Sequence, residues 1–389
     1  MRYEARGVSP DKPDVKAAIA GSDRGLFPGA FCKAVPDVFT GSPEHCVVLH
    51  ADGAGTKSAL AYVHYRKHED PAIFRGIAQD ALVMNLDDIL CVGATGPYLF
   101  SNTIGRNARL IDRHVLREII NGYEALSARL RTFGVDIQAC GGETADLGDI
   151  VRTLVVDATL VARMRRDEFI NCQSIRPGHV IIGLASYGQA AYEDSYNSGI
   201  AANGFTAVRH ELLSTRYHEK FPETYAPEIS DLAYTGAYDI DDPLPGTALS
   251  LGDALLSPTR TFAPILLPVF AKYRSRISGI FHNTGGGQTK CLNFGTDVHY
   301  EKTDVIDVPP IFQFVREVTR LSPSEMLRTF NMGTLMEIVC ESSASSGIIE
   351  IAKSFGVEAR IVGHVAPSTE GRSLTIVLDG VRYDFKAST

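Results

Sequence analysis

The sequence predicts an α/β protein of the α+β type, built from two domains. Three observations lead to this prediction. The chain has 389 residues, which is more than one hydrophobic core usually supports. Apolar runs typical of strands alternate with stretches of helical periodicity in both halves. A polar stretch without periodicity, residues 163–178, lies between the halves, so we place the domains at 1–168 and 169–389.

In the first domain, residues 47–49 form an apolar, β-branched run that predicts a strand ending at a Gly-rich turn. Asp112 is the expected N-cap of a helix, because apolar residues then recur at helical spacing until Gly134 supplies the stop. A strand over 135–139 should run out into Gly-Gly-Glu-Thr, and residues 154–161 predict another strand.

The second domain repeats this order. Strands are predicted at 179–185, 277–281 and 335–340, and a last strand over 359–365 is expected to close the fold. Ser322 and Glu325 flank a Pro in the pattern of a capped helix start, and another helix should end at Gly356. Residues 214–250 contain several Pro and Asp and little periodicity, which indicates an insertion.

Composition excludes several classes of function. The formal charge is −8, with scattered Lys and Arg, so we expect no nucleic-acid partner. No apolar run is long enough for a membrane span, and the Met1 segment lacks a signal-peptide core, so we expect a cytoplasmic protein. The seven cysteines show no C-x-x-C pair, and no G-x-S-x-G elbow is present, which disfavours zinc, redox and covalent catalysis.

The segment HADGAGTK, residues 50–57, combines backbone freedom with opposite charges. Gly53 and Gly55 allow a tight turn that presents N–H groups, while Asp52 and Lys57 suit a metal-bound phosphate. The spacing is not that of a Walker loop.

Three acids, Asp80, Asp87 and Asp88, occur in an otherwise apolar stretch. On a continuous helix Asp80 and Asp87 share a face, and Asp88 lies at its edge. Carboxylates among Leu, Val and Met are costly unless a cation neutralises them, and Mg²⁺ is the natural candidate. The alternative is that these acids are caps or solvated residues.

Two further segments follow predicted strands. In GGETAD, residues 141–146, a carboxylate stands beside two glycines, in the manner of a ligand site or of a plain turn. In HNTGGGQTK, residues 282–290, three glycines favour a nest of backbone amides for an anion, and His282 is either a proton donor or a structural residue.

Taken together, these segments resemble the aminoimidazole ribonucleotide synthetase (phosphoribosylformylglycinamidine cyclo-ligase) family, whose superfamily also includes selenophosphate synthetase and thiamine-monophosphate kinase. HADGAGTK is similar to the family's TDGVGTK, GGETA is identical, and Asp88 with the following Gly-Ala and Pro resembles D-x4-G-A-x-P with one extra residue. SGIAANGFTAVR, LLSPTRTF, HNTGGG and EMLRTFNMG resemble further segments of the family, and LSPTR, HNTGGG and RTFNMG are the ones that distinguish the purine enzyme.

This resemblance implies ATP-dependent ring closure of formylglycinamidine ribonucleotide to aminoimidazole ribonucleotide, with Mg²⁺. It implies a homodimer whose first domains form a β-barrel across the interface, a second domain with a split mixed sheet, and ATP between the domains and across the dimer. The implied metal ligands are Asp52, Asp88 and Glu143, and the implied catalytic residues are His282, Asp88 and Lys57. The other implied nucleotide contacts are Gly53, Gly55, Thr56, Asp80, Asp87, Gly141, Gly142, Thr144 and the loop of Gly25, Gly29 and Lys33; the substrate contacts are Ser198, Asn203, Gly285, Gly286 and Gly287.

Two departures leave the substrate open. Ala201 and Ala202 replace the family's His-Ser after an unusually long loop, and the N-terminal Gly-rich segment is reduced to GLFPGAF. Glu193, Asp194 or Tyr196 in the longer loop could compensate. The alternatives are an ATP-dependent enzyme of the same superfamily with another small substrate, or a nucleotide-binding relative without turnover.

Overall fold

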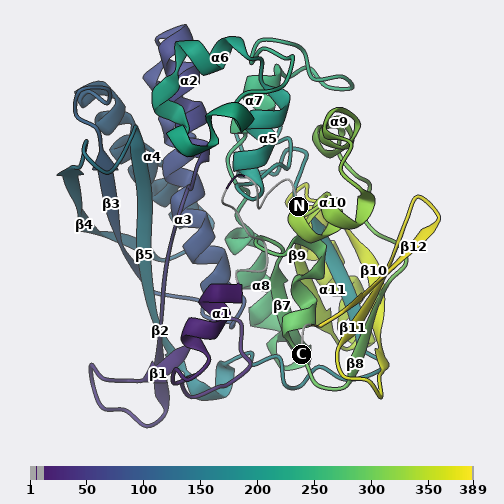
Figure 1. The fold of residues 1–389 in the computed structure, drawn as a ribbon. Coiled ribbons are helices and arrows are strands. Elements are labelled where there is room, and N and C mark those ends of the chain that lie inside the picture. Colours follow the sequence, from purple (N-terminus) through teal and green to yellow (C-terminus); the bar gives the residue numbers. More distant parts are fainter. Residues whose placement is uncertain (1–5, 7–12, 388–389) are drawn as a thin grey trace.

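A computed structural model describes residue 6 and residues 13–387 (Figure 1). The Met1 segment, on which the expectation of no signal peptide rests, lies outside the described residues. Two sheets organise the described chain, one in each half, and α3 runs between them (Figure 1).

The first sheet has five strands in the order β1-β2-β5-β3-β4. Only β3 and β4 are parallel, so the sheet is mixed. The helices α3 and α4 cover one face, and the other face has no covering element in the described chain (Figure 1). The elements of this half are α1 (Pro13–Ile19), β1 (Ala34–Pro36), β2 (His45–Gly53), α2 (Lys57–His68), α3 (Phe74–Leu90), β3 (Tyr98–Arg106), α4 (Arg113–Thr132), β4 (Ile137–Asp146) and β5 (Leu154–Arg165).

The helix predicted after Asp112 is confirmed as α4. The Asp112 carboxylate accepts hydrogen bonds from the backbone N–H groups of His114 and Val115, which the helix itself cannot satisfy. Gly134 follows the helix with φ +81°, a conformation that favours glycine.

The predicted end of the strand at Ala139 is wrong. Strand β4 continues through Gly141 and Gly142 to Asp146 and pairs with β3 along this length. The register shifts between Phe100 and Asn102, and a Cβ on Gly142 would lie 2.2 Å from Asn102 Oδ1. The two glycines therefore permit a bulge within a strand, not a turn after it.

The second sheet has seven strands in the order β12-β11-β8-β10-β6-β9-β7. It is also mixed, because β11 pairs with β8 in parallel while the other pairs are antiparallel. The strands are β6 (Val180–Ala185), β7 (Ile277–His282), β8 (Val298–Lys302), β9 (Thr334–Cys340), β10 (Ala359–Pro367), β11 (Ser373–Leu378) and β12 (Val381–Lys386). The helices are α5 (Phe205–Leu212), α6 (Arg216–Lys220), α7 (Leu251–Leu256), α8 (Ala263–Tyr273), α9 (Pro310–Thr319), α10 (Pro323–Thr329) and α11 (Ser342–Ser354).

Two predictions for this half have opposite outcomes. The capped start at Ser322 is confirmed, since Ser322 and Glu325 form a reciprocal capping box at α10. The expectation that residues 359–365 close the fold is wrong, because β11 and β12 follow as a hairpin. Leu374, Ile376 and Leu378 are buried and occur at every second position, a period-two pattern that could have revealed β11.

The predicted insertion at 214–250 packs into the core through buried aromatic side chains. Tyr217, Tyr225 and Tyr234 are buried and in ring contact with one another or with His210. The backbone N–H of Tyr234 donates to His210 Nδ1 at 3.3 Å, and His210 Nε2 has no hydrogen-bond partner among the described residues.

His210 should make stability depend on pH. Burial lowers the pKa of His210 to about 2, so the folded protein keeps the ring neutral while the unfolded chain protonates it near pH 6.5. The unfolded state thus gains protons as the pH falls, and folding loses about 2 kcal/mol between pH 7 and pH 5. In His210→Asn, an acceptor for Tyr234 remains but the titration is gone. Urea unfolding of both proteins at the two pH values should show this extra loss in the wild type only.

The two-domain α/β class is confirmed, with a mixed sheet in each half. The first sheet is open within one chain, so a closed barrel does not form from the described residues of a single protomer. No helix in residues 13–387 combines the length and apolar character required to cross a bilayer.

Candidate active site

The three acids lie on one continuous helix, as predicted, and all three are buried. Helix α3 packs against β2 and β5 of the first sheet and also contacts α8 and β7 of the second half. Helix α3, which carries these acids, therefore lies where the two halves of the chain meet, and Figure 1 shows the helix in this position.

Asp80 is paired with Lys57, and both side chains are fully buried. Lys57 Nζ lies 3.0 Å from Asp80 Oδ2 and donates to the carbonyl oxygens of Ala201 and Ser257. Thr259 adds hydrogen bonds to Asp80 from its N–H and its hydroxyl, at 2.7 and 2.6 Å. Burial lowers the pKa of Lys57 and raises the pKa of Asp80, and the ion pair and hydrogen bonds oppose both shifts. Both side chains hold segments of the chain together in this arrangement, and the contact of Lys57 with a phosphate stays a prediction.

Asp87 is held in a similar way. Its carboxylate accepts hydrogen bonds from the Thr261 hydroxyl at 2.6 Å and from the Phe262 N–H at 2.9 Å. Burial raises the pKa of Asp87 to about 6. Protein groups therefore surround both acids, with the Lys57 ammonium group beside Asp80, and their direct contact with a nucleotide stays a prediction.

Asp88 lies between two histidines from different halves of the chain. His282, at the end of β7, donates from Nδ1 to Asp88 Oδ1 at 2.8 Å, and His50 Nε2 on β2 lies 3.2 Å from Asp88 Oδ2. His50 Nδ1 contacts Asn85 Oδ1 at 3.0 Å. His282 Nε2 is buried and has no hydrogen-bond partner in the described chain. With its proton on Nδ1, His282 presents Nε2 as the atom that can accept a proton.

The charge state of this cluster follows from its neighbours. Burial would raise the pKa of Asp88, but the hydrogen bond from His282 and the electrostatic attraction of the basic side chains around it, Lys290 included, lower it below its usual value. Cys32 donates to the Asp88 carbonyl oxygen, and burial raises the pKa of its thiol well above the usual range. Cys32 is therefore not a nucleophile, consistent with the sequence.

The three predicted metal ligands do not meet in one chain. Strands β2 and β4 are separated by β5 and β3, which corresponds to about 14 Å. Asp52 and Glu143 also belong to adjacent rows of the sheet, whose side chains point to opposite faces. Asp88 is engaged by its histidines. The described residues contain no group of three His, Cys, Asp or Glu side chains placed to hold a metal ion.

The residues around Asp52 and Glu143 are accessible. Asp52, Gly55, Thr56 and the Gly141–Thr144 segment are exposed, and Gly53 is partly exposed. Thr56 contacts Thr206 of α5 at 2.9 Å, which joins the two halves next to the glycine turn. Lys33 is exposed beside Asp23 at 3.1 Å, near Gly25 and Gly29. These groups remain available to a phosphate.

The glycine-rich loop after His282 forms a tight turn. Gly286 and Gly287 adopt φ of +93° and +50°, and Lys290 Nζ lies 3.4 Å from the Thr284 hydroxyl. Gly285 is exposed, whereas Gly287 is buried against the segment that follows α10. The Gly287 N–H donates to the Thr284 carbonyl oxygen at 2.9 Å, so an anion-binding nest formed by the remaining glycine N–H groups stays a prediction.

A matched pair of variants tests this loop. A Cβ at Gly287 would lie 2.4 Å from the Phe330 carbonyl oxygen, whereas a Cβ at Gly285 would meet nothing within 4 Å. We expect Gly287→Ala to displace the loop and to cost roughly 2 kcal/mol of stability. Gly285→Ala should keep wild-type stability. Equal unfolding midpoints in urea for the two variants would contradict this placement.

The predicted substrate segment 198–203 is hydrogen-bonded to other parts of the protein. The Ser198 hydroxyl donates to the Ala254 carbonyl oxygen at 2.6 Å, so Ser198 is occupied by the protein. Asn203 is partly exposed and precedes Gly204 at the start of α5. Ala201, which replaces the family His, is buried with φ +57° and offers its carbonyl oxygen to Lys57.

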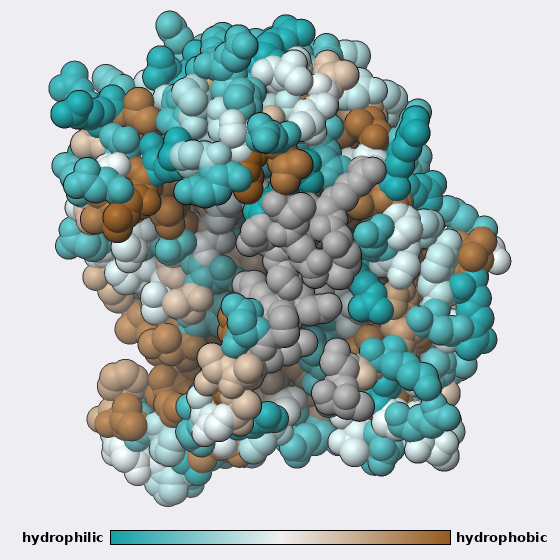
Figure 2. Space-filling model, in the orientation of Figure 1, coloured by the Kyte–Doolittle hydropathy of each residue, from teal (hydrophilic) through white to brown (hydrophobic). Residues whose placement is uncertain are grey.

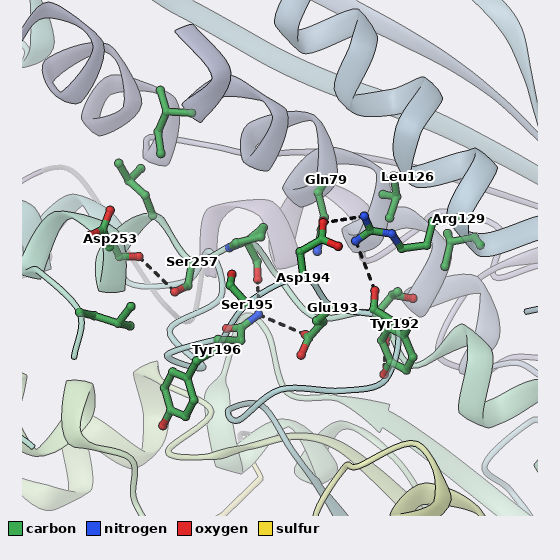
Figure 3. Close-up of a pocket in the computed structure, with 17 residues that line it drawn as sticks. Gln79, Leu126, Arg129, Tyr192, Glu193, Asp194, Ser195, Tyr196, Asp253 and Ser257 are labelled. Carbon is green, nitrogen blue, oxygen red and sulfur yellow. Dashed lines mark hydrogen bonds and ion pairs between the residues drawn. The ribbon is translucent and has the colours of Figure 1, made fainter. Parts of the chain in front are cut away.

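The longer loop lines a cavity of about 410 Å³ between α4, α7 and residues 192–197 (Figure 3). Glu193 binds the buried Arg260 through both carboxylate oxygens, at 2.9 and 2.5 Å. Asp194 pairs with Arg129 of α4 at 2.6 Å. These two acids are thus committed to protein partners. Tyr196 lines the cavity, and its hydroxyl has no hydrogen-bond partner among the described residues.

Sequence reasoning missed His50, although a signal was present. In strand β2 the residues His50 and Asp52 share a face because side chains alternate, so the selection of Asp52 as a site residue could also have pointed to His50. The roles of Glu193 and Arg260 depend on a contact between residues 67 positions apart and had no local signal.

Comparison with known proteins identifies the family. The family model described as "AIR synthase related protein, N-terminal domain" matches residues 33–164, and the one described as "AIR synthase related protein, C-terminal domain" matches residues 176–375. The chain belongs to the AIR synthase related protein family. Both sheets of the structure fall largely within these two matched ranges.

Relatives in this family have a common name. The chain is 26% identical over 330 residues to the phosphoribosylformylglycinamidine cyclo-ligase of Methanococcus vannielii, covering 84% of this chain and 80% of that protein. It is 27% identical over 396 residues to the protein of that name from Desulfotalea psychrophila, covering 97% of each chain.

Solved structures share the fold of the family. A chain in the HypE-HypF complex superposes with a TM-score of 0.56 at 13% identity, covering 96% of this chain and 99% of that chain. Thermotoga maritima PurL complexed with ADP superposes with a TM-score of 0.55 at 12% identity, covering 99% of this chain. The chain spans about half the length of PurL, 50% in this comparison. These likenesses support the fold alone.

Proposed function

We propose that this protein catalyses the ATP-dependent ring closure of formylglycinamidine ribonucleotide to aminoimidazole ribonucleotide, releasing ADP and phosphate in purine biosynthesis. The family membership and the shared name of its relatives support this assignment. The observation that carries it is the junction of Asp88 with His282, which leaves a buried Nε2 beside a glycine-rich loop.

The chemistry requires activation of a poor leaving group. The formyl oxygen attacks the γ-phosphorus of ATP, and the bond between that phosphorus and ADP breaks. The amidine-side nitrogen then forms a C–N bond to the formyl carbon, the C–O bond breaks, and phosphate departs. A proton must leave the attacking nitrogen, and we assign its removal to His282 Nε2. Asp88 fixes the His282 tautomer and stabilises the imidazolium that forms.

The exposed acids fit the nucleotide end of the reaction. Asp52 and Glu143 are hard oxygen donors on glycine-flanked strands, which suits Mg²⁺ and a triphosphate. When bound, Mg²⁺ would neutralise charge on the transferred phosphoryl group. Because Asp52 and Glu143 face opposite sides of the first sheet, we propose that both reach one nucleotide only when a second copy of the chain contributes to the site.

The open face of the first sheet supports a homodimer. Leu49, Leu99 and Val155 are 59%, 43% and 42% exposed, and Leu49 and Leu99 flank Val161 in one row of the sheet. Figure 2 shows apolar side chains gathered on the side of the molecule where this sheet lies. Apolar residues in a row on an uncovered sheet are typical of a protein interface.

The dimer has a direct test. We expect the wild type to sediment as a dimer and Leu49→Glu to shift to monomer, because a charge at a two-fold interface is buried twice. Glu124→Gln, on the solvent side of α4, is the matched control and should remain dimeric. A monomeric wild type at micromolar concentration would overturn the homodimer.

The activity test uses purified protein, Mg-ATP and formylglycinamidine ribonucleotide. We expect ADP and aminoimidazole ribonucleotide to appear in equal amounts. A second candidate, another small substrate for the same ATP site, is favoured by Ala201 and by the cavity of the longer loop. Substrate-stimulated ADP release without the imidazole product would favour that second candidate, and absence of nucleotide binding would exclude both.

A further inference from the structure

We propose that Asn331 and Gln288 form a joint that fixes three loops relative to one another and thereby sets the affinity for the phosphorylated substrate. The three loops are residues 197–204, 283–287 and 330–333. This inference rests on the proposed function, because the first two loops carry the predicted substrate contacts. Asn331 and Gln288 are positioning residues, since both are buried, at 3% and 2% exposure.

Asn331 joins the first loop to the third. Its side-chain Nδ2 donates to the Gly199 carbonyl oxygen at 3.0 Å, across 132 residues of chain. Its Oδ1 accepts from the Gly333 N–H at 2.8 Å. One side chain thus sets the position of the loop that contains Ser198 and Asn203 relative to the segment entering β9.

Gln288 joins the second loop to the third. It follows the three glycines directly, and its Nε2 donates to the carbonyl oxygens of Asn331 and Thr334. Gly287 adds a steric constraint, because its Cα packs so closely against the Phe330 carbonyl that a side chain has no room. The glycine-rich loop therefore cannot shift without moving Asn331 and, through it, Gly199.

A buried ion pair contacts Gln288 and helps to fix its position. Lys302 Nζ donates to the Gln288 carbonyl oxygen at 2.8 Å and pairs with Glu337 Oε1 at 2.6 Å, and both charged side chains are fully buried. A fully buried ion pair is commonly no more stable than apolar residues of the same volume. A gain in stability therefore does not explain why Lys302 and Glu337 are buried together. The pair does hold the Lys302 ammonium group in a fixed position, where it donates to the Gln288 carbonyl oxygen.

The joint should act on one substrate and not on the other. Its three loops belong to the second half of the chain, whereas the exposed acids expected at the triphosphate, Asp52 and Glu143, belong to the first sheet. Preorganised loops contribute to binding because their geometry is fixed before the ligand arrives. Loss of the joint should therefore weaken binding of formylglycinamidine ribonucleotide and leave ATP binding nearly unchanged.

The decisive variant is Asn331→Asp, which keeps the acceptor for Gly333 and replaces the donor to Gly199 with a second oxygen. We expect the KM for formylglycinamidine ribonucleotide to rise roughly 10-fold or more, because a buried carbonyl loses its partner. The KM for ATP should change less than about 2-fold. Lys302→Met with Glu337→Leu, which removes the pair without leaving a lone charge, should fold and show the same selective rise.

Ser322→Ala is the matched control. It removes a capping hydrogen bond of α10, a few residues before Asn331, and so destabilises the same segment without touching the joint. It should leave both KM values unchanged. The proposed joint is refuted if Asn331→Asp raises the two KM values equally. It is also refuted if Asn331→Asp changes neither KM value, as is expected for Ser322→Ala.

A second measurement separates this inference from the proposed function. Backbone amide signals of Gly199, Gly285 and Gly286 in ¹H–¹⁵N spectra should all move in Asn331→Asp and in Gln288→Ala, and remain in place in Ser322→Ala. If the wild type shows no cyclo-ligase activity, the proposed function fails and the amide signals alone decide the joint. Signals that move only at Gly199 would overturn the link between the loops.

Discussion

Replacing Asp88 with Asn should lower the rate of aminoimidazole ribonucleotide formation by about 10²- to 10⁴-fold. The carboxylate accepts from His282 Nδ1 and lies against His50, so it sets the tautomer that leaves His282 Nε2 free for a proton. An amide in this position can present its N–H₂ group to His282 Nδ1, which would turn the proton to Nε2. Steady-state assays of ADP and of the imidazole product measure the change.

The control for Asp88→Asn is Asp379→Asn, which removes an exposed carboxylate paired with Arg316 and should retain wild-type activity. Circular dichroism and the unfolding midpoint show whether Asp88→Asn is folded. A folded Asp88→Asn protein with more than about half of the wild-type rate would show that Asp88 has no part in the reaction.

Lys57→Met should destabilise the protein by about 3–5 kcal/mol, since it leaves the fully buried Asp80 without its cation. Lys57→Met combined with Asp80→Leu removes both charges and should recover most of the loss, although Thr259 then lacks its acceptor. Urea unfolding of the two single variants and the double variant gives the coupling free energy.

The outcome of this cycle decides between two roles for Lys57. If the residue mainly contacts phosphate, as the sequence suggests, Lys57→Met will keep its stability and lose ATP binding. If it mainly holds Ala201 and Ser257, as its hydrogen bonds indicate, stability will fall first. Single and double variants with equal stability would contradict the buried ion pair.

Much of the fold could be predicted because its signals are local. The helix after Asp112 and the capping box at Ser322 depend on residues within a few positions of one another. The continuation of β4 beyond Ala139 could not be predicted in this way. It depends on Asn102 of a neighbouring strand, which turns a glycine pair into a bulge.

The site was predictable as a set of segments but not as a set of contacts. Motif resemblance selected Asp88 and His282, and the fold places them 2.8 Å apart across 194 residues. Spacing on α3 correctly predicted that Asp80 and Asp87 share a buried helix, but it could not reveal that threonines of the 257–262 segment satisfy them. Long-range partners of this kind leave no period in the sequence.

The acids of α3 have a consequence for any attempt to divide the chain. A fragment ending at Arg165 would expose Asp80 and Asp87 without Thr259, Thr261 and Phe262, while the remainder would lose its anchor for the start of α8. Neither half should persist alone as a cooperative unit, despite each having its own sheet. Produced together as two polypeptides, the halves should instead recognise each other and reassemble, with these polar contacts as the matching surface.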